Sequence, residues 1–266
     1  MSDLTSVNMF PTITIGPLQL SSYGVIYSVA IVVFGMLVFH RLVKAGYPVP
    51  VITRGIVVAI LGGIAGAVLW HGLAYLIQAF FLDGELSWRW GAGFMGVVLG
   101  GSVTVLVYAR RHGYAAGPVL DLAAWPLALG QAIGRLGCFA AGCCYGKAAD
   151  SWPGMYLRDV GGRWIMRYPT QLISSAADLC IFLVLLTFER WRKRRPDKPE
   201  GWPFGGFVFL LYVELYSLKR FSIEFIRGDS LPLLGPFTVN HIICLLVFIV
   251  CVVIMLRKLH SRSSDM

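Results

Sequence analysis

The feature that most constrains the fold is a series of apolar segments, each about twenty residues long, that recurs along the whole sequence. A helix of that length spans the hydrocarbon core of a bilayer, which is about 30 Å thick. Hydrophobic residues make up 57% of the 266 residues and charged residues only 14%, a balance typical of integral membrane proteins. We therefore expect an all-α integral membrane protein with seven transmembrane helices, at residues 21–43, 54–82, 91–111, 117–138, 168–190, 203–226 and 237–258.

The distribution of positive charge predicts the orientation of these helices. More than half of the 23 Lys and Arg residues fall on one predicted side: Arg41, Lys44, Arg54, Arg110, Arg111, the run from Arg190 to Lys198, Arg257, Lys258 and Arg262. Cytoplasmic loops carry such an excess, so we expect the N-terminus outside and the C-terminus in the cytoplasm. The net charge of +9 then reflects topology and attraction to anionic membrane lipid, and it requires no nucleic-acid partner.

The chain shows no internal repeat, and we expect a single polytopic membrane domain over residues 1–266. Residues 1–20 contain no Lys or Arg and do not resemble a cleavable signal peptide, so they are predicted to form an outer arm. An outer loop is expected at 147–167 and a cytoplasmic tail at 259–266. The spacings Gly62-x-x-x-Gly66 and Gly96-x-x-x-Gly100 predict close packing of helices two and three against their neighbours.

Two arginines are expected at one depth, near the outer leaflet. Helices four and six both run outward, which puts Arg135 and Arg220 roughly 27 and 26 Å along them at 1.5 Å per residue. The other helices bring further side chains to that level: Tyr23, His71, Met95, the run from Tyr168 to Gln171, and His241. A guanidinium at such a depth costs several kcal/mol unless it is paired or faces water, and its planar fork suits the phosphate of a phospholipid.

A structural interpretation of the same charges stays open. Arg220 would pair with Glu224 one turn on, Arg227 would reach to the surface, and Arg135 would anchor helix four at the headgroups. Asp178 and Glu214 fall near mid-bilayer, where a carboxylate needs a partner or stays protonated. These two carboxylates allow a small transporter as an alternative class, although polar groups gathered at one depth argue against a conduit.

Several motifs, taken in order, resemble the prolipoprotein diacylglyceryl transferase family over nearly the whole chain. They are Gly16-Pro17 with Tyr23-Gly24, the Gly-rich helix two, Phe94-Met95-Gly96 with Gly100, Gly134-Arg135-x-Gly-x-Phe-x-x-Gly with Gly146, Tyr168-Pro169-Thr170-Gln171-Leu172, and Tyr216-x-x-x-Arg220-x-x-x-Glu224-x-x-Arg227. The Gly-Arg-x-Gly-x-Phe-x-x-Gly core is the most specific of these motifs.

The resemblance implies a transferase that moves a diacylglyceryl group from phosphatidylglycerol to the lipobox cysteine of a prolipoprotein, releasing glycerol phosphate. It implies a multi-pass enzyme of the bacterial inner membrane, without a cofactor or metal, whose active site faces the outer leaflet. Arg135 and Arg220 match the family's phosphate-site arginines, and Tyr23 is expected beside them. The substrate-binding positions implied by the matching motifs are Tyr216, Glu224, Arg227, Gly134, Gly146, Gln171 and Met95.

The chain also departs from the family pattern. Met95 and Tyr168 stand where the family has histidines, Ile64 stands where it has an arginine, and Cys138 to Cys143 replaces Asn-Phe-x-Asn-Gly-Glu. His71 and His241 are interpreted either as packing residues at helix interfaces or, because methionine accepts no proton, as the base that Met95 cannot supply. These departures leave open a diverged relative with another acceptor, or with a membrane thiol or redox role.

Three interpretations compete for Cys138, Cys143 and Cys144. They are small packing residues or a local disulfide, with a pair to Cys138 favoured over a strained vicinal bridge; a reactive thiolate whose pKa is lowered by Arg135 and Lys147; or a metal site. The spacing C-x-x-x-x-C-C without a fixed histidine is a poor zinc motif, so the sequence by itself does not indicate a metal. Cys180, Cys244 and Cys251 lie in apolar runs and are expected to pack.

Overall fold

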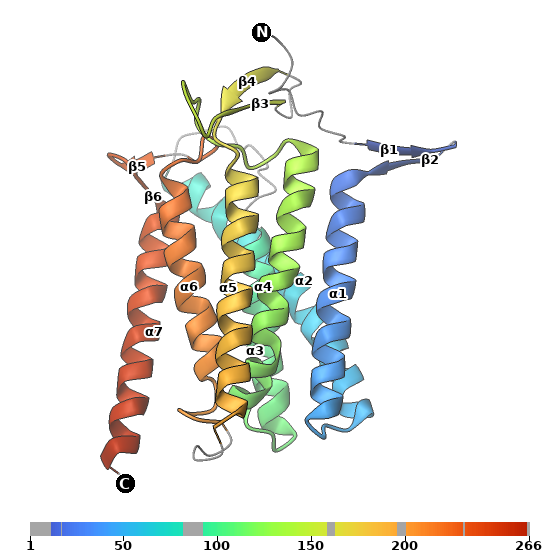
Figure 1. Cartoon of the computed structure of the whole chain (residues 1–266), viewed down its shortest axis with the longest axis vertical. Helices are drawn as coiled ribbons and strands as arrows, with labels where there is room; N and C mark the ends of the chain where they lie inside the picture. Colours follow the sequence, from blue (N-terminus) through green and yellow to red (C-terminus); the bar gives the residue numbers. More distant parts are fainter. Residues whose placement is uncertain are drawn as a thin grey trace. The chain divides into compact units, whose positions relative to one another are not determined.

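The computed structural model describes residues 12–16, 18–81, 93–158, 163–195, 201–230 and 232–264, and these are mostly helical (Figure 1). The chain divides into two compact units. The larger unit comprises Met1–Val38 and Leu120–Met266, and the smaller unit comprises Phe39–Val119. The single-domain organisation expected from sequence stays a prediction.

The described residues contain the seven expected helices. Their bounds are α1 Ser22–Lys44, α2 Val49–Phe81, α3 Gly93–Arg111, α4 Ala116–Ala141, α5 Thr170–Lys193, α6 Phe207–Glu224 and α7 Val239–Ser264. Helix α2 begins five residues earlier than the sequence predicts, because a proline is tolerated in the first turn of a helix. The carbonyl of Pro48 accepts hydrogen bonds from Val51 and Ile52 there.

Four of these helical segments are long and apolar enough to cross a membrane: Ser22–Lys44, Val49–Trp70, Thr170–Lys193 and Val239–Ser261. Helix α6 has only 18 residues and carries Glu214, Lys219, Arg220 and Glu224. Charged side chains lower its mean hydropathy, so length and composition do not identify it as a span. The seven-span topology therefore stays a prediction.

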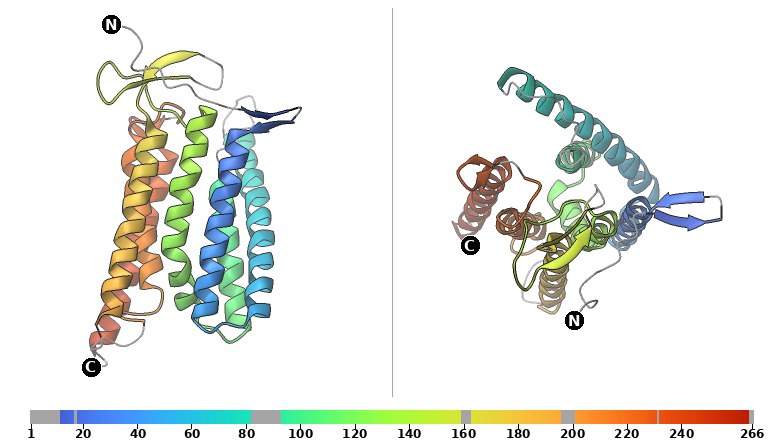
Figure 2. Two further views of the ribbon diagram at one scale, coloured as in Figure 1. Left: turned by 45° about the vertical axis from the view of Figure 1, so that its right-hand side comes forward. Right: turned by 90° about the horizontal axis from the view of Figure 1, so that it is seen from above.

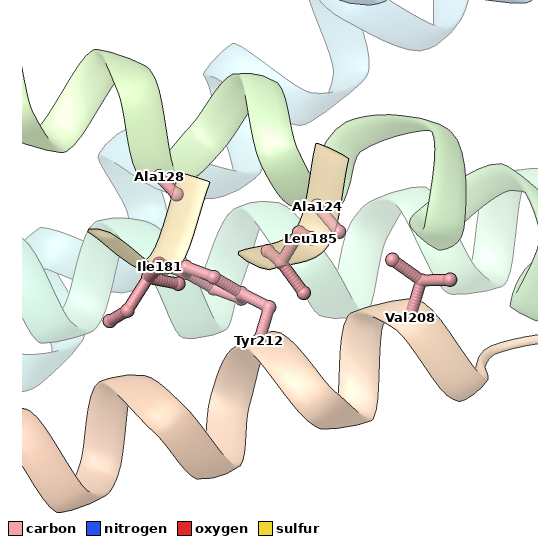
Figure 3. Close-up of a cluster of buried hydrophobic side chains, with 6 residues drawn as sticks. All are labelled: Ala124, Ala128, Ile181, Leu185, Val208 and Tyr212. Atoms are coloured by element: carbon pink, nitrogen blue, oxygen red, sulfur yellow. The ribbon is translucent and has the colours of Figure 1, made fainter. Parts of the chain in front are cut away.

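Helices α4, α5 and α6 of the larger unit meet at a small apolar core. Figure 3 shows Ala124 and Ala128 of α4 facing Ile181 and Leu185 of α5, with Tyr212 of α6 beside them. Alanines on α4 allow the larger side chains of the other two helices to approach its backbone. This packing holds α4 and α6, the helices that carry the two expected phosphate-site arginines, in one unit.

Asp121 fixes the start of α6. Its carboxylate oxygens accept hydrogen bonds from the backbone N–H groups of Gly206 and Phe209 at 2.8 and 2.9 Å. These donors lie at the first turn of α6, where helical N–H groups lack partners within the helix. The capping residue is therefore supplied by another helix, from 85 residues earlier in the chain.

The connections between the helices contain three antiparallel strand pairs, which the sequence did not predict. Strand β1 (Thr12–Ile15) pairs with β2 (Leu18–Ser21), β3 (Met155–Arg158) with β4 (Trp164–Arg167), and β5 (Pro232–Leu234) with β6 (Phe237–Thr238). All three lie at the helix ends opposite the C-terminus (Figures 1 and 2). The predicted outer arm thus contains a hairpin, and the predicted outer loop contains β3 and β4.

The smaller unit is built on close contact between α2 and α3. A Cβ atom added to Gly66 would collide with the carbonyl oxygen of Gly96 and the Cα atom of Gly100, and one added to Gly62 would collide with Thr104. The two backbones therefore approach to a distance that only glycine permits. This confirms the packing interpretation of the two glycine spacings.

Candidate functional site

The charged centre of the larger unit is the carboxylate of Glu224, the last residue of α6. Its Oε2 atom lies 3.0 Å from Nη2 of Arg220 and 3.7 Å from Nε of Arg227. Its Oε1 atom accepts hydrogen bonds from Ser230, Thr238 and Asn240 at 2.7, 3.0 and 2.8 Å. Glu224 is fully buried, so its charge is neutralised by two guanidinium groups and three neutral donors.

Arg227 is held at this centre and does not reach out to the surface. Its Nε and Nη2 atoms donate to the two carboxylate oxygens of Asp229 at 2.9 and 2.6 Å, a bidentate arrangement that fixes the plane of the guanidinium. Its side chain is only 12% exposed. The structural interpretation of the sequence was wrong for Arg227 and right for the pair between Arg220 and Glu224.

Arg135, from the C-terminal half of α4, differs from the other cations. It interacts electrostatically with Tyr216, with Cys138 and Cys144, and with the more distant carboxylate of Asp178. No carboxylate among the described residues lies within ion-pair distance of it. Arg135 is thus a half-buried cation without a carboxylate partner of its own.

Arg135 and Arg220 both interact with one aromatic side chain. Both guanidinium groups interact electrostatically with the hydroxyl of Tyr216, and they interact with each other. The two arginines predicted at one depth are therefore neighbours in the structure. Their mutual repulsion would be relieved by an anion bound between them.

Helix α1 brings two tyrosines to the same region. Tyr23 and Tyr27 stack with ring centroids 5.3 Å apart, and Tyr27 interacts electrostatically with Arg135 and Tyr216. A side chain at Gly134 would touch the Tyr27 ring, so this glycine lets α1 approach α4 closely. Tyr23 lies by the three cysteines and remains 38% exposed.

Sequence reasoning missed one member of the site, Lys219. Its Nζ atom lies 2.7 Å from Oδ1 of Asp178 on α5, with both side chains buried, and 4.2 Å from the centroid of the Tyr216 ring. Asp178 thus has the partner that a carboxylate at its expected depth needs. A lysine beside Arg220 in an apolar helix was the available signal, since a buried cation requires a buried anion.

The three cysteines Cys138, Cys143 and Cys144 converge at the end of α4. The sulfur atoms of Cys138, Cys143 and Cys144 all lie within 4.8 Å of one another, and all three are free thiols. The disulfide favoured by the sequence analysis is therefore not formed in this structure. Hydrogen bonds from Cys138 and Cys143, and the charges of Arg227 and Arg135, hold the pKa of the Cys144 thiol below its ordinary value.

Buried polar side chains from the start of α5 fix the backbone of this cysteine turn. Gln171 Nε2 donates to the carbonyl of Cys143 at 2.8 Å, and Thr170 Oγ1 donates to that of Cys144 at 2.7 Å. Both donors are almost wholly buried. Gln171, expected in a substrate-binding position, thus contacts the cysteine turn.

Gly146, just beyond the cysteines, lies where three segments of the chain are joined by backbone hydrogen bonds. Gly146 N–H donates to the carbonyl of Tyr168, and the neighbouring Lys147 N–H donates to that of Ile226 at 2.8 Å. Gly228 N–H returns a hydrogen bond to Tyr145 at 3.0 Å. A side chain at Gly146 would collide with the carbonyl of Tyr168, which explains why glycine occupies this position.

Among the described residues, His241 is hydrogen-bonded to the residues around Glu224 through Nδ1 alone. Nδ1 accepts a hydrogen bond from the backbone N–H of Thr238 at 3.0 Å, and the rings of Phe221, Phe225 and Phe237 surround the imidazole. The side chain is 1% exposed, and its Nε2 atom has no hydrogen-bond partner in the described structure. This enclosure favours a positioning role over the role of base.

Two expected site residues belong to the smaller unit. The side chains of His71 and Met95 lie outside the described residues, so their predicted place beside the arginines is untested. A shallow hollow on α5 is lined by Val184, Thr187, Phe188 and Trp191 and includes none of the candidate site residues. The predicted placement of Arg135 and Arg220 in a phosphate site stays a prediction.

These features define a helical membrane protein with a cationic site, in which arginines, tyrosines and thiols meet at one end of the larger unit. The model of the prolipoprotein diacylglyceryl transferase family matches residues 11–257. The chain therefore belongs to that family.

Relatives match over nearly their whole length. The phosphatidylglycerol–prolipoprotein diacylglyceryl transferase of Clostridium tetani is 31% identical over 237 residues, covering 88% of this chain and 91% of the relative. The phosphatidylglycerol–prolipoprotein diacylglyceryl transferase 2 of Clostridium perfringens is 27% identical, and the match covers 93% of this chain and 94% of the relative. The phosphatidylglycerol–prolipoprotein diacylglyceryl transferase of Methylococcus capsulatus is 27% identical, and the match covers 95% and 96%.

Proposed function

We propose that this protein transfers the diacylglyceryl group of phosphatidylglycerol to the cysteine thiol of a prolipoprotein. The observation that carries the proposal is Arg135, a half-buried guanidinium without a carboxylate partner among the described residues, which interacts electrostatically with Tyr216 and Arg220. The larger unit gathers four cations here, Arg135, Lys219, Arg220 and Arg227, against three carboxylates, Asp178, Glu224 and Asp229. The remaining positive charge is matched to a lipid phosphate.

The arrangement suits the departure of a phosphate. In the reaction the acceptor sulfur attacks the glycerol carbon of the lipid, the bond from that carbon to the phosphate oxygen breaks, and its electron pair leaves on glycerol phosphate. Negative charge therefore builds up on the phosphate as the transition state forms. Fixed cations at that point stabilise the transition state more than the bound substrate.

Arg135 and Arg220 have different parts in this scheme. Arg220 is positioned by Glu224 at 3.0 Å and so offers its remaining N–H groups in a fixed direction. Arg135 has no such partner and makes its strongest contact with the phosphate itself. Tyr216, which interacts electrostatically with both arginines, helps to orient them, and Lys219, paired with Asp178, packs against the Tyr216 ring.

The membrane arrangement is part of the proposal. All seven helices cross the inner membrane, with the N-terminus outside and the C-terminus in the cytoplasm, so that the ends of α4 and α6 reach the outer leaflet. The positive charge of the opposite loops supports this orientation. Phosphatidylglycerol enters sideways from the lipid, and the lipobox segment of the prolipoprotein approaches from the outer side.

The test is a transfer assay with the purified full-length protein in phosphatidylglycerol vesicles. Lipid labelled in its acyl chains and in its headgroup glycerol is incubated with a lipobox peptide, and lipidated peptide and released glycerol phosphate are measured together. Equal amounts of both products are expected. A peptide with serine in place of its cysteine is the control, and absence of both products from folded protein would refute the proposal.

A further inference from the structure

The three-thiol cluster has a geometry that neither packing nor a disulfide requires. Neighbouring side chains in an extended segment point in opposite directions, yet the thiols of Cys143 and Cys144 both point toward Cys138. The turn is made by two residues with positive φ, Gly142 at 71° and Cys144 at 58°. A left-handed backbone at a residue other than glycine or asparagine is uncommon and is found at functional sites.

The surrounding structure holds this turn in place. The carbonyls of Cys143 and Cys144 are fixed by Gln171 and Thr170, and the backbone N–H of Cys143 donates to the carbonyl of Cys138 at 3.2 Å. The cluster is thus preorganised from two sides. A disulfide would bond two of the three sulfurs and leave the third unbonded, whereas a metal ion can bind all three.

The charges around the cluster also suit a metal–thiolate complex. Arg135 interacts electrostatically with Cys138 and Cys144, and Arg227 interacts with Cys144. Three thiolates around one divalent cation carry a net charge of −1, and a fourth thiolate makes it −2. The complex is therefore an anion, and the two adjacent guanidinium groups stabilise its negative charge.

We infer that Cys138, Cys143 and Cys144 bind a zinc ion whose fourth coordination position takes the thiol of the acceptor. Zinc in catalytic sites keeps three protein ligands and one open position. With zinc–sulfur bonds of about 2.3 Å, tetrahedral geometry places two ligand sulfurs roughly 3.8 Å apart, so sulfurs within 4.8 Å need only small side-chain rotations. This inference rests on the proposed function, because it names how that reaction activates its nucleophile.

The zinc site activates the acceptor thiol without a histidine base in the larger unit. The two histidines of that unit are His241, enclosed by aromatic rings, and His260, near the far end of α7. A thiol bound to zinc loses its proton outright, here to water. The bound sulfur then donates an electron pair to the glycerol carbon, the carbon–oxygen bond to the phosphate breaks, and the thioether product leaves the unchanged zinc ion.

The first experiment measures binding, with Co²⁺ as a spectroscopic probe for zinc in the reduced, chelator-treated full-length protein. One Co²⁺ per chain is expected, with intense sulfur-to-metal charge-transfer bands that zinc abolishes. Cys138→Ser, Cys143→Ser and Cys144→Ser are each expected to weaken zinc binding by more than the roughly 10- to 100-fold that loss of an outer-shell partner costs. Cys180→Ser, which replaces an exposed cysteine elsewhere on α5, is the matched control and keeps full affinity.

A second measurement avoids variants that fold poorly. In the unmodified protein, zinc is expected to protect the three cluster cysteines from alkylation, mapped by mass spectrometry, and to leave the extent of Cys180 alkylation unchanged. Absence of charge-transfer bands, or equal alkylation with and without zinc, would overturn the inference. So would a preference for Cu(I) with no zinc binding.

The decisive step adds the lipobox peptide to the Co²⁺ protein. The cysteine peptide is expected to shift the visible bands of Co²⁺, and its serine version is expected to leave them unchanged. Undiminished transfer by metal-free enzyme would overturn the zinc inference and leave the proposed function standing. A cysteine-specific shift without any transfer from phosphatidylglycerol would instead confirm the thiol site and refute the proposed function.

Discussion

The carboxylate of Glu224 lies 3.0 Å from the guanidinium of Arg220, one helical turn earlier on α6. The same carboxylate contacts Arg227 at 3.7 Å and accepts three further hydrogen bonds. One buried anion thus fixes two cations and the start of α7. The position of Arg220 depends on this contact, whereas that of Arg135 does not.

Replacing Arg135 by alanine is expected to reduce transfer by about 100- to 1,000-fold, the effect of removing one donor from a preorganised anion site. The protein should keep its thermal unfolding midpoint, because Arg135 leaves no carboxylate partner behind in the part of the chain that the structure describes. Arg135→Lys should recover only a small part of the activity, since lysine lacks the planar fork. Arg190→Ala, an exposed arginine at the opposite end of α5, is the control, and equal loss in both would contradict the assignment.

Replacing Glu224 by glutamine is expected to lower both stability and activity. The amide keeps a hydrogen-bonding side chain but removes the negative charge between Arg220 and Arg227, and breaking a buried ion pair costs roughly 3–5 kcal/mol. Unfolding in detergent measures this loss. Glu214→Gln, on the same helix and half-buried, should change stability far less, and similar losses in the two variants would show that the contact with Arg220 has no special weight.

The buried pair between Lys219 and Asp178 predicts a non-additive result. Lys219→Met alone leaves a buried carboxylate without its partner and should cost roughly 3–5 kcal/mol, whereas the double variant with Asp178→Leu should recover most of that loss. Chemical denaturation of the two single variants and the double variant gives the coupling free energy. Additive losses would mean that the two side chains act independently. Activity should stay low in the double variant if the pair orients Tyr216.

Replacing Gly146 by alanine should disturb the site through the backbone. The added methyl group would collide with the carbonyl of Tyr168, and such overpacking costs about 1–3 kcal/mol. Because Lys147 and Gly228 are paired across the same contact, Arg227 should be displaced and transfer reduced. Gly35→Ala on α1, where nothing lies within 4 Å of the new atom, is the control and should retain wild-type stability and transfer.

The sequence predicts the helices well and their partners poorly. Apolar runs set the bounds of α1 to α7 to within six residues, because length and hydropathy are local properties of the chain. Pairing between helices is not local, and neither the capping of α6 by Asp121 nor the partner of Lys219 leaves a spacing pattern. The short strand pairs were missed for a related reason, since a pair of three or four residues has too little periodicity to be recognised.

The candidate site was likewise predictable only where local properties of the chain decide it. Depth along a helix can be calculated, so Arg135 and Arg220 were expected together and are neighbours in the structure. The direction of a side chain in a turn cannot be calculated from spacing. The sequence C-x-x-x-x-C-C therefore gives no sign that three sulfurs converge, because that convergence depends on the positive φ values of Gly142 and Cys144.

The backbone contact around Gly146 has a consequence for how an acceptor is received. Segments that follow α4, precede α5 and follow α6 are joined there by hydrogen bonds among Gly146, Lys147, Tyr168, Ile226 and Gly228. Such cross-linked backbone leaves little conformational entropy to be lost when a flexible peptide arrives. In the proposed reaction, the entropy lost on association is then lost mainly by the peptide. Cyclising or otherwise stiffening a lipobox peptide should therefore tighten its binding more than any change in the backbone around Gly146.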